Sequence, residues 1–101
     1  MNKIVVMYPS QADQEQFESR FLAEHVPLAR KLPGLVKIES ARIKTGPETP
    51  SPAAFMAELY FKDKDSLKAA LKSPEMGACA ADMQAHVPTG SWVYISDEIR
   101  D

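Results

Sequence analysis

The amino-acid sequence predicts an α+β domain in which strands and helices follow the order βαββαβ. Four short runs rich in β-branched and aromatic residues lie near the two ends of the chain and at two places in its middle. Apolar residues at helical spacing follow the first and the third of these runs. This arrangement predicts a four-stranded antiparallel sheet with both helical regions on one face, the ferredoxin-like layout.

Each element has its own start or stop signal. Asp13 can help to open the first helix, and Pro33-Gly34 ends it. Segment 45–52 contains three prolines and a glycine and is therefore predicted to be a loop. Ser73 followed by Pro74 is typical of a helix start, so the second helical region should consist of two pieces. The expected strands cover residues 3–8, 35–43, 55–61 and 91–96.

The composition narrows the function classes. A chain of 101 residues suffices for one domain with a real core. The net charge is −2 and no basic cluster occurs, which argues against nucleic acid as a partner. No apolar run reaches the about 20 residues that span a bilayer, and no signal-peptide pattern follows the first residue. The single cysteine, Cys79, favours a reduced, cytoplasmic setting. No Cys/His spacing suggests a metal, and no cofactor is expected.

The strand at residues 55–61 is apolar on both of its faces, as is the first strand. A sheet face exposed to water would normally carry polar residues. We therefore expect Phe55, Leu59 and Phe61 to pack against the sheet of a second copy, which gives a symmetric homodimer.

His25 is the most informative single residue. Read at helical spacing, it falls on one stripe with four apolar residues, Phe17, Phe21, Leu28 and Leu32. An ionisable ring therefore stands where the pattern asks for an apolar side chain. Pro27 should loosen the helix beside it, because proline lacks an N–H and crowds the preceding turn. These features favour a reactive pocket, although an inward-facing histidine is more often a satisfied core residue.

Glu58 interrupts the apolar strand 55–61. If Phe55, Leu59 and Phe61 face a partner subunit, Glu58 faces the helices and could approach His25. A carboxylate favours the imidazolium and burial disfavours it, so such a histidine could serve as a general base or acid near neutral pH. His25 and Glu58 are therefore the predicted catalytic residues. The alternative is that Glu58 pairs with Arg42 of the neighbouring strand for structural reasons.

Aromatic and methionine side chains are the candidate substrate contacts. Tyr8, Tyr60 and Trp92 would supply wall and hydrogen-bond donors. Met76 and Met83 would add an adaptable lining from the second helical region. A stripe of Met, Ala and Cys at helical spacing is more often plain core, and this alternative stays open.

Several segments in their order resemble the EthD-like family of the dimeric α+β barrel group. The resemblance spans almost the whole chain, and its most specific part is His25-x-Pro27-Leu28 after a strand that ends in Tyr8-Pro9. It implies two ferredoxin-like subunits packed sheet to sheet, each with a cleft between its sheet and its helices. Relatives include muconolactone-type isomerases, polyketide cyclases, proteins linked to ether degradation and cofactor-free monooxygenases. The family often has a histidine in strand three, where this chain has Glu58, so a two-histidine mechanism does not carry over directly.

Two functional hypotheses follow. The first is a cofactor-independent enzyme of isomerase, cyclase or monooxygenase type that acts on a small apolar carbonyl or aromatic compound. The second is a non-catalytic dimeric ligand-binding or accessory protein with a vestigial pocket. Fold alone does not choose between them.

Overall fold

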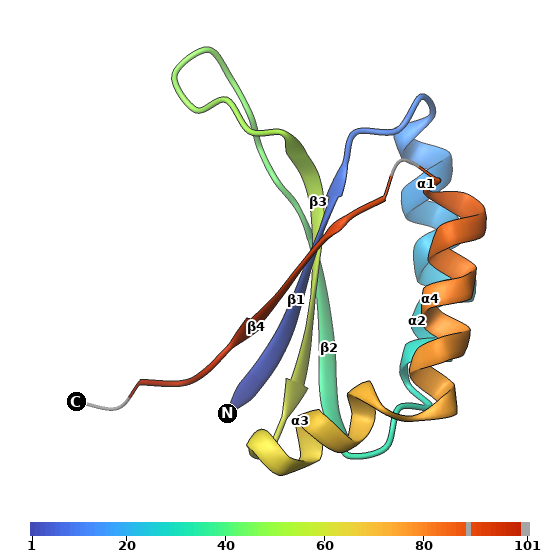
Figure 1. Ribbon diagram of the computed structural model, residues 1–101. Helices are drawn as coiled ribbons and strands as arrows, with labels where there is room; N and C mark the ends of the chain where they lie inside the picture. The colour runs from blue at the N-terminus through green and yellow to red at the C-terminus, as the bar shows by residue number, and fades with distance from the viewer. Residues whose placement is uncertain (89, 100–101) are drawn as a thin grey trace.

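The computed structural model of the chain describes residues 1–88 and 90–99. Its four strands form one antiparallel sheet in the order β2-β3-β1-β4, which confirms the predicted arrangement (Figure 1). The strands are β1 (Asn2–Pro9), β2 (Leu35–Arg42), β3 (Ala53–Phe61) and β4 (Trp92–Ser96).

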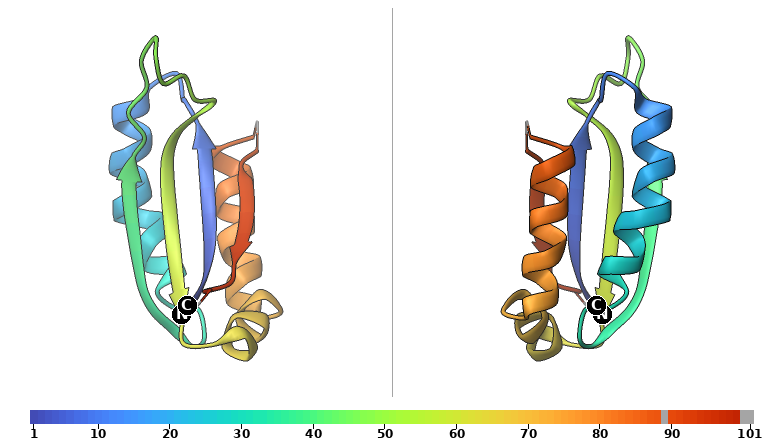
Figure 2. Two further views of the ribbon diagram at one scale, coloured as in Figure 1. Left: turned by 90° about the vertical axis from the view of Figure 1, so that its left-hand side faces the viewer. Right: turned by 90° about the vertical axis from the view of Figure 1, so that its right-hand side faces the viewer.

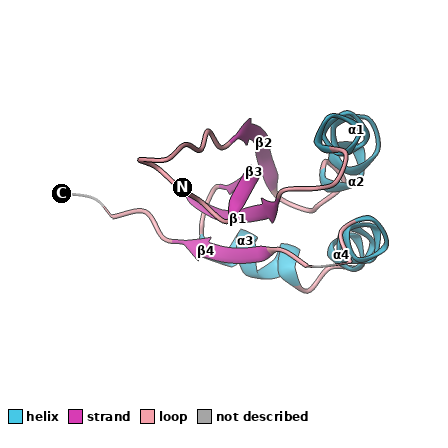
Figure 3. Ribbon diagram, turned by 90° about the horizontal axis from the view of Figure 1, so that it is seen from above, coloured by secondary structure: helices cyan, strands magenta, loops and turns pink. Residues whose placement is uncertain are grey.

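The helices form a second layer that covers one face of the sheet and leaves the other face open (Figures 2 and 3). The first helical region runs through α1 (Gln14–Arg20), a π-helical turn η1 (Phe21–His25) and α2 (Val26–Ala29). The second consists of α3 (Lys64–Leu71) and α4 (Pro74–His86), the two pieces that the sequence predicts. Ser73 caps α4 as expected, because its hydroxyl accepts a hydrogen bond from the Met76 N–H. Within the described ranges, no helix is long and apolar enough to cross a membrane.

The facing of β3 differs from the sequence-based expectation. Phe55, Leu59 and Phe61 are buried beneath the helices, so their assignment to a dimer interface was wrong. Glu58 and Tyr60 alternate with them and lie on the open face. The physical reason is the cost of burying a charge. If the other face of β3 met the helices, the carboxylate of Glu58 would lose its contact with water.

The π-helical turn sits directly before Pro27. The Val26 N–H bonds to the carbonyl of Phe21, five residues earlier, so the helix is one residue wider than an α-helix there. A proline ring crowds the carbonyl four residues before it, and the wider turn provides room. The predicted loosening beside His25 therefore takes the form of a π turn. This turn keeps Phe21 and His25 buried on the face that meets the sheet.

Candidate functional site

A cavity of about 430 Å³ lies between the sheet and the helices. Its size falls within the roughly 300–1,000 Å³ that small-molecule sites occupy. The cavity reaches the surface beside β4, where Val93 lines it and is 60 % exposed. The wall is mostly apolar and includes Ile4, Val6, Phe21, Ala29, Leu32, Ile38, Ala57, Leu59, Met76 and Met83.

His25 contributes an imidazole to this wall, and it is only 6 % exposed. Its Nδ1 lies 2.9 Å from Oδ2 of Asp82, which comes from α4. A carboxylate only accepts hydrogen bonds, so Nδ1 carries the proton and donates a hydrogen bond to Asp82. The neutral ring then keeps the lone pair of Nε2 free. In the described structure no buried side-chain nitrogen or oxygen lacks a hydrogen-bond partner, and Nε2 has no protein partner, so this atom meets the solvent-filled cavity.

Arg20 holds the other side of the carboxylate. One of its guanidinium nitrogens lies 2.5 Å from Oδ1 of Asp82, and its Nε lies 3.3 Å from Glu24. Asp82 is therefore fixed by two helical segments, through Arg20 at the end of α1 and His25 at the end of η1. Because Asp82 is held in place, its hydrogen bond fixes the tautomer and the orientation of the His25 imidazole.

Electrostatics favour an ionised Asp82 beside a neutral His25 at pH 7. Burial lowers the pKa of His25, while the hydrogen bond and the charge of Asp82 raise it and Arg20 lowers it further; the net shift is downward. Burial alone would raise the pKa of Asp82, but the hydrogen bonds from His25 and Arg20 outweigh it and the pKa is lowered. The resulting arrangement is an unprotonated Nε2, backed by a carboxylate, in an apolar cavity. This is what a general base at neutral pH requires.

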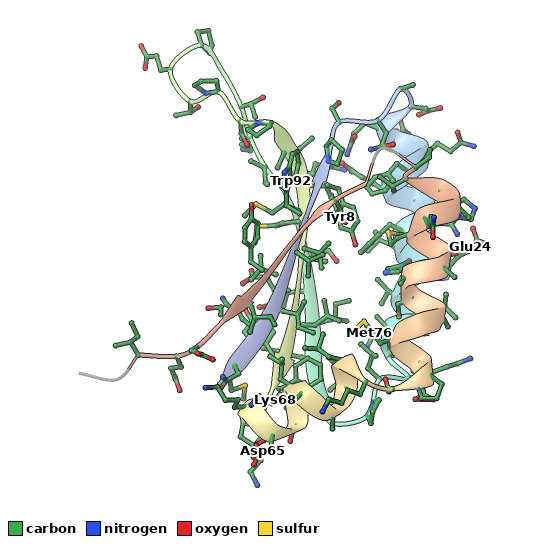
Figure 4. All side chains as sticks on the ribbon, in the orientation of Figure 1. Tyr8, Glu24, Asp65, Lys68, Met76 and Trp92 are labelled. Carbon is green, nitrogen blue, oxygen red and sulfur yellow. The ribbon has the colours of Figure 1, made fainter. Side chains whose placement is uncertain are left out.

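The predicted substrate contacts separate into two groups. Tyr8, Met76 and Met83 line the cavity, and Figure 4 shows Tyr8 and Met76 pointing into the space between sheet and helices. Tyr60 and Trp92 lie on the open face instead. Trp92 pairs with Met7 in the sheet, and Met7 faces away from the helices because its neighbour Tyr8 faces them.

Glu58 does not approach His25. It lies on the open face, where its carboxylate binds Nζ of Lys3 at 2.5 Å and accepts a 3.4 Å hydrogen bond from the Tyr60 hydroxyl. The alternative pairing with Arg42 is wrong as well, because Arg42 binds Glu18 at 2.6 Å. The first expectation depended on the inverted facing of β3. The second fails because the register of β2 and β3 places Arg42 opposite Phe55 and Glu39 opposite Glu58.

Asp82 is the site residue that sequence reasoning missed. It stands three residues after Cys79 and one before Met83, at the flank of the inward stripe of α4. A carboxylate at that place was a usable signal, since acids are rarely buried without a partner. The described residues contain no group of three or more His, Cys, Asp or Glu side chains that could hold a metal ion.

Fold and site together define a small α+β protein that presents a carboxylate-backed histidine to an apolar cavity. The chain belongs to the EthD family, whose domain model matches residues 10–87. An uncharacterised 11.0 kDa protein in the thcB-thcC intergenic region of Rhodococcus erythropolis is 28 % identical over 98 residues, covering 97 % of this chain and 95 % of that protein. The crystal structure of an ethyl tert-butyl ether D family protein from Bacillus halodurans superposes with a TM-score of 0.87 at 29 % identity, covering 98 % of this chain and 99 % of that one.

Two more distant structures share the fold. SnoaB, a cofactor-independent oxygenase from Streptomyces nogalater, has a TM-score of 0.70 at 19 % identity and covers 99 % of this chain and 94 % of its own. A dimeric ferredoxin-like protein of unknown function from Jannaschia has a TM-score of 0.69 at 18 % identity, with coverages of 96 % and 98 %. The fold of this chain is therefore ferredoxin-like.

Proposed function

We propose that this protein is a cofactor-independent enzyme that moves protons on a small, apolar carbonyl or aromatic compound. The observation that carries the proposal is the hydrogen bond between His25 and Asp82, which leaves Nε2 of His25 unprotonated at the cavity wall. The fold neighbour described as a cofactor-independent oxygenase supports the same class of chemistry. Glu58 has no part in this proposal, because it lies on the opposite face of the sheet.

His25 would act as the base, and Asp82 would hold its ring and stabilise the imidazolium that forms. Once a substrate has displaced the water from this apolar cavity, proton removal gains from fixed charges and loses little to solvent rearrangement. Isomerisation and cyclisation need only that the proton return to another atom. Oxygenation needs dioxygen as a co-substrate in addition.

The test follows the exchange of acidic C–H protons in D₂O with 2-tetralone, an apolar bicyclic ketone, as the probe. We expect protein-dependent exchange, monitored by proton NMR, and its loss by about 10²–10⁴-fold in His25→Gln. The rate should rise with pH and level off above a pKa lower than the ordinary value of about 6.5, because only the neutral imidazole accepts a proton.

His86 cannot serve as the control, because its Nδ1 lies 3.6 Å from Oδ1 of Asp82. Lys68→Gln is the control instead, since Lys68 lies exposed on α3 and does not line the cavity. Its exchange rate should equal that of the wild type. Saturable binding of 2-tetralone without exchange would contradict the enzyme and favour the non-catalytic ligand-binding alternative. Equal rates in His25→Gln and the wild type would remove His25 from the mechanism.

We also propose that a second copy of the chain covers the open face of the sheet. Apolar and aromatic residues gather there in β1, β3 and β4, and most are half-buried or exposed: Val5, Met7, Met56, Tyr60, Trp92 and Tyr94. A patch of this kind on a small protein is typical of an interaction surface. The dimeric ferredoxin-like neighbour from Jannaschia supports a symmetric pair.

Sedimentation at micromolar concentration should therefore give a mass about twice the 11.2 kDa of one chain. Met7→Glu should shift the equilibrium toward the monomer, because association would then bury one unpaired carboxylate from each copy. Leu22→Glu, on the exposed side of η1, should leave the mass unchanged. A wild-type mass of one chain would refute the dimer.

A further inference from the structure

Tyr8 is the most buried polar side chain of the cavity wall. It comes from the end of β1 and is 1 % exposed. Figure 4 shows its side chain directed from the sheet toward the helices. Its ring packs against Phe17, Phe21 and Phe55 at centroid distances of 5.6, 5.5 and 6.2 Å. The ring is therefore held on its flanks, and its hydroxyl end is directed to the cavity.

The hydroxyl of Tyr8 has no hydrogen-bond partner among the described residues. A hydroxyl shut away from both protein and water would count as a buried unsatisfied atom, and the described chain contains none. The oxygen of Tyr8 must therefore touch the space of the cavity. A buried tyrosine usually finds a partner for its hydroxyl, because leaving that group unpaired is unfavourable. An unpaired hydroxyl at a cavity indicates a partner that comes from outside the chain.

Tyr8 and His25 converge on the same part of the cavity. Both rings pack on Phe21, with centroid distances of 5.5 Å for Tyr8 and 5.0 Å for His25. The carboxylate of Asp82, which binds His25, is also close enough to act on Tyr8: burial raises the pKa of Tyr8, and Cys79 and Asp82 raise it further. The phenol therefore stays protonated at neutral pH, and toward an anion it acts as the hydrogen-bond donor.

We propose, on the basis of the acid–base role of His25, that the cavity takes ketones that carry an acidic C–H bond on the carbon next to the carbonyl group. The Tyr8 hydroxyl donates a hydrogen bond to that oxygen while Nε2 of His25 removes the proton. An apolar wall with two converging polar groups fits such a molecule, which is apolar apart from one oxygen.

The proton-transfer step balances without any co-reactant. The C–H bond breaks and an N–H bond forms on Nε2 of His25. The electron pair of the C–H bond moves into a new C=C bond, and the carbonyl π pair moves onto oxygen, which becomes an enolate. The hydrogen bond from Tyr8 strengthens as this oxygen gains charge, so Tyr8 stabilises the transition state more than the bound ketone. Return of the proton to the same or another carbon regenerates neutral His25.

The test compares the wild type with Tyr8→Phe, which removes one oxygen and keeps the ring. We expect Tyr8→Phe to slow the exchange of 2-tetralone by about 10²-fold, the size of effect found for one oxyanion donor. Wild-type protein should bind 2-tetralone at least about tenfold more tightly than tetralin, which lacks the oxygen, because tetralin would leave the hydroxyl unpaired. In Tyr8→Phe this preference should fall to within about threefold.

The Tyr94 hydroxyl lies on the open face of the sheet, which is proposed to meet a second copy, and not in the cavity. Tyr94→Phe is therefore the matched control for the cavity, compared under conditions where its sedimentation mass equals that of the wild type. It should change neither the exchange rate nor the ligand preference. The melting temperature of Tyr8→Phe should not fall, since the lost hydroxyl has no partner in the described chain, so unfolding does not confound the comparison.

The outcomes separate this inference from the proposed function. Exchange that depends on His25 but is equal in the wild type and Tyr8→Phe would overturn the role of Tyr8 and leave the base intact. Absence of exchange together with a ketone preference that depends on Tyr8 would overturn the base and keep the oxygen-binding site. Failure of the wild type to bind 2-tetralone in preference to tetralin would overturn the inferred ligand class.

Discussion

Replacing Asp82 with asparagine should reduce the exchange of 2-tetralone by on the order of 10³–10⁴-fold, similar to the about 10⁴-fold loss known for an Asp-to-Asn change behind a catalytic histidine. The introduced amide would offer its N–H₂ to Nδ1 of His25, which would move the ring proton to Nε2. The base would then point its proton, and not its lone pair, into the cavity. Asparagine also cannot neutralise Arg20, which lies 2.5 Å from the native carboxylate. The measurement is the same NMR exchange assay.

A second readout identifies the cause of the loss. Asp82 raises the pKa of His25, so the pKa of the residual activity should move further below its ordinary value in Asp82→Asn. Asp65→Asn, an exposed change in the first turn of α3, is the control and should alter neither the rate nor the pH profile. A full rate with an unchanged pH profile in Asp82→Asn would show that the carboxylate has only a structural role.

Phe21→Ala should destabilise the fold by about 3–5 kcal/mol. Phe21 has no exposed surface and packs against the rings of Tyr8, Phe17, His25 and Phe55. Its removal would merge a new void with the cavity, and the surrounding rings come from several different elements, so they cannot collapse into it together. Urea unfolding at a fixed protein concentration measures the loss as a lower midpoint at an unchanged slope.

Leu22→Ala is the matched control for this change. Leu22 is the next residue of the same π turn, yet it is 57 % exposed. Its truncation should alter the free energy of unfolding by less than about 0.5 kcal/mol, as is usual for surface positions. A loss below about 1 kcal/mol in Phe21→Ala would contradict a core centred on this residue.

The sequence predicted what depends on local pattern. The order of the elements, the two pieces of the second helical region and the inward position of His25 all follow from spacing, caps and prolines within single segments. Asp82 could not be paired with His25 in this way. The two residues stand 57 positions apart, and the contact depends on how α4 packs against η1.

The prediction of which face of β3 packs against the helices was wrong for a different reason. A strand that is apolar on both sides does not reveal from spacing alone which side meets the helices. The deciding signal was the charge of Glu58, which had been interpreted as a functional residue inside the site. In the structure that charge marks the outer face, where Lys3 neutralises it. A carboxylate within an apolar strand therefore indicates first which face of that strand is turned away from the helices.

The exposed edge of β4 affects how strongly the chain tends to aggregate. It is an edge strand, four of its five residues are exposed, and the run Trp-Val-Tyr-Ile-Ser contains neither a proline nor a charge. Edges of this kind attract further strands, and natural proteins usually protect them with lysine, proline or a bulge. This chain has none of these devices within β4. In the dimer proposed above, the second copy would cover the apolar face beside β4 and so reduce the surface that further strands can reach.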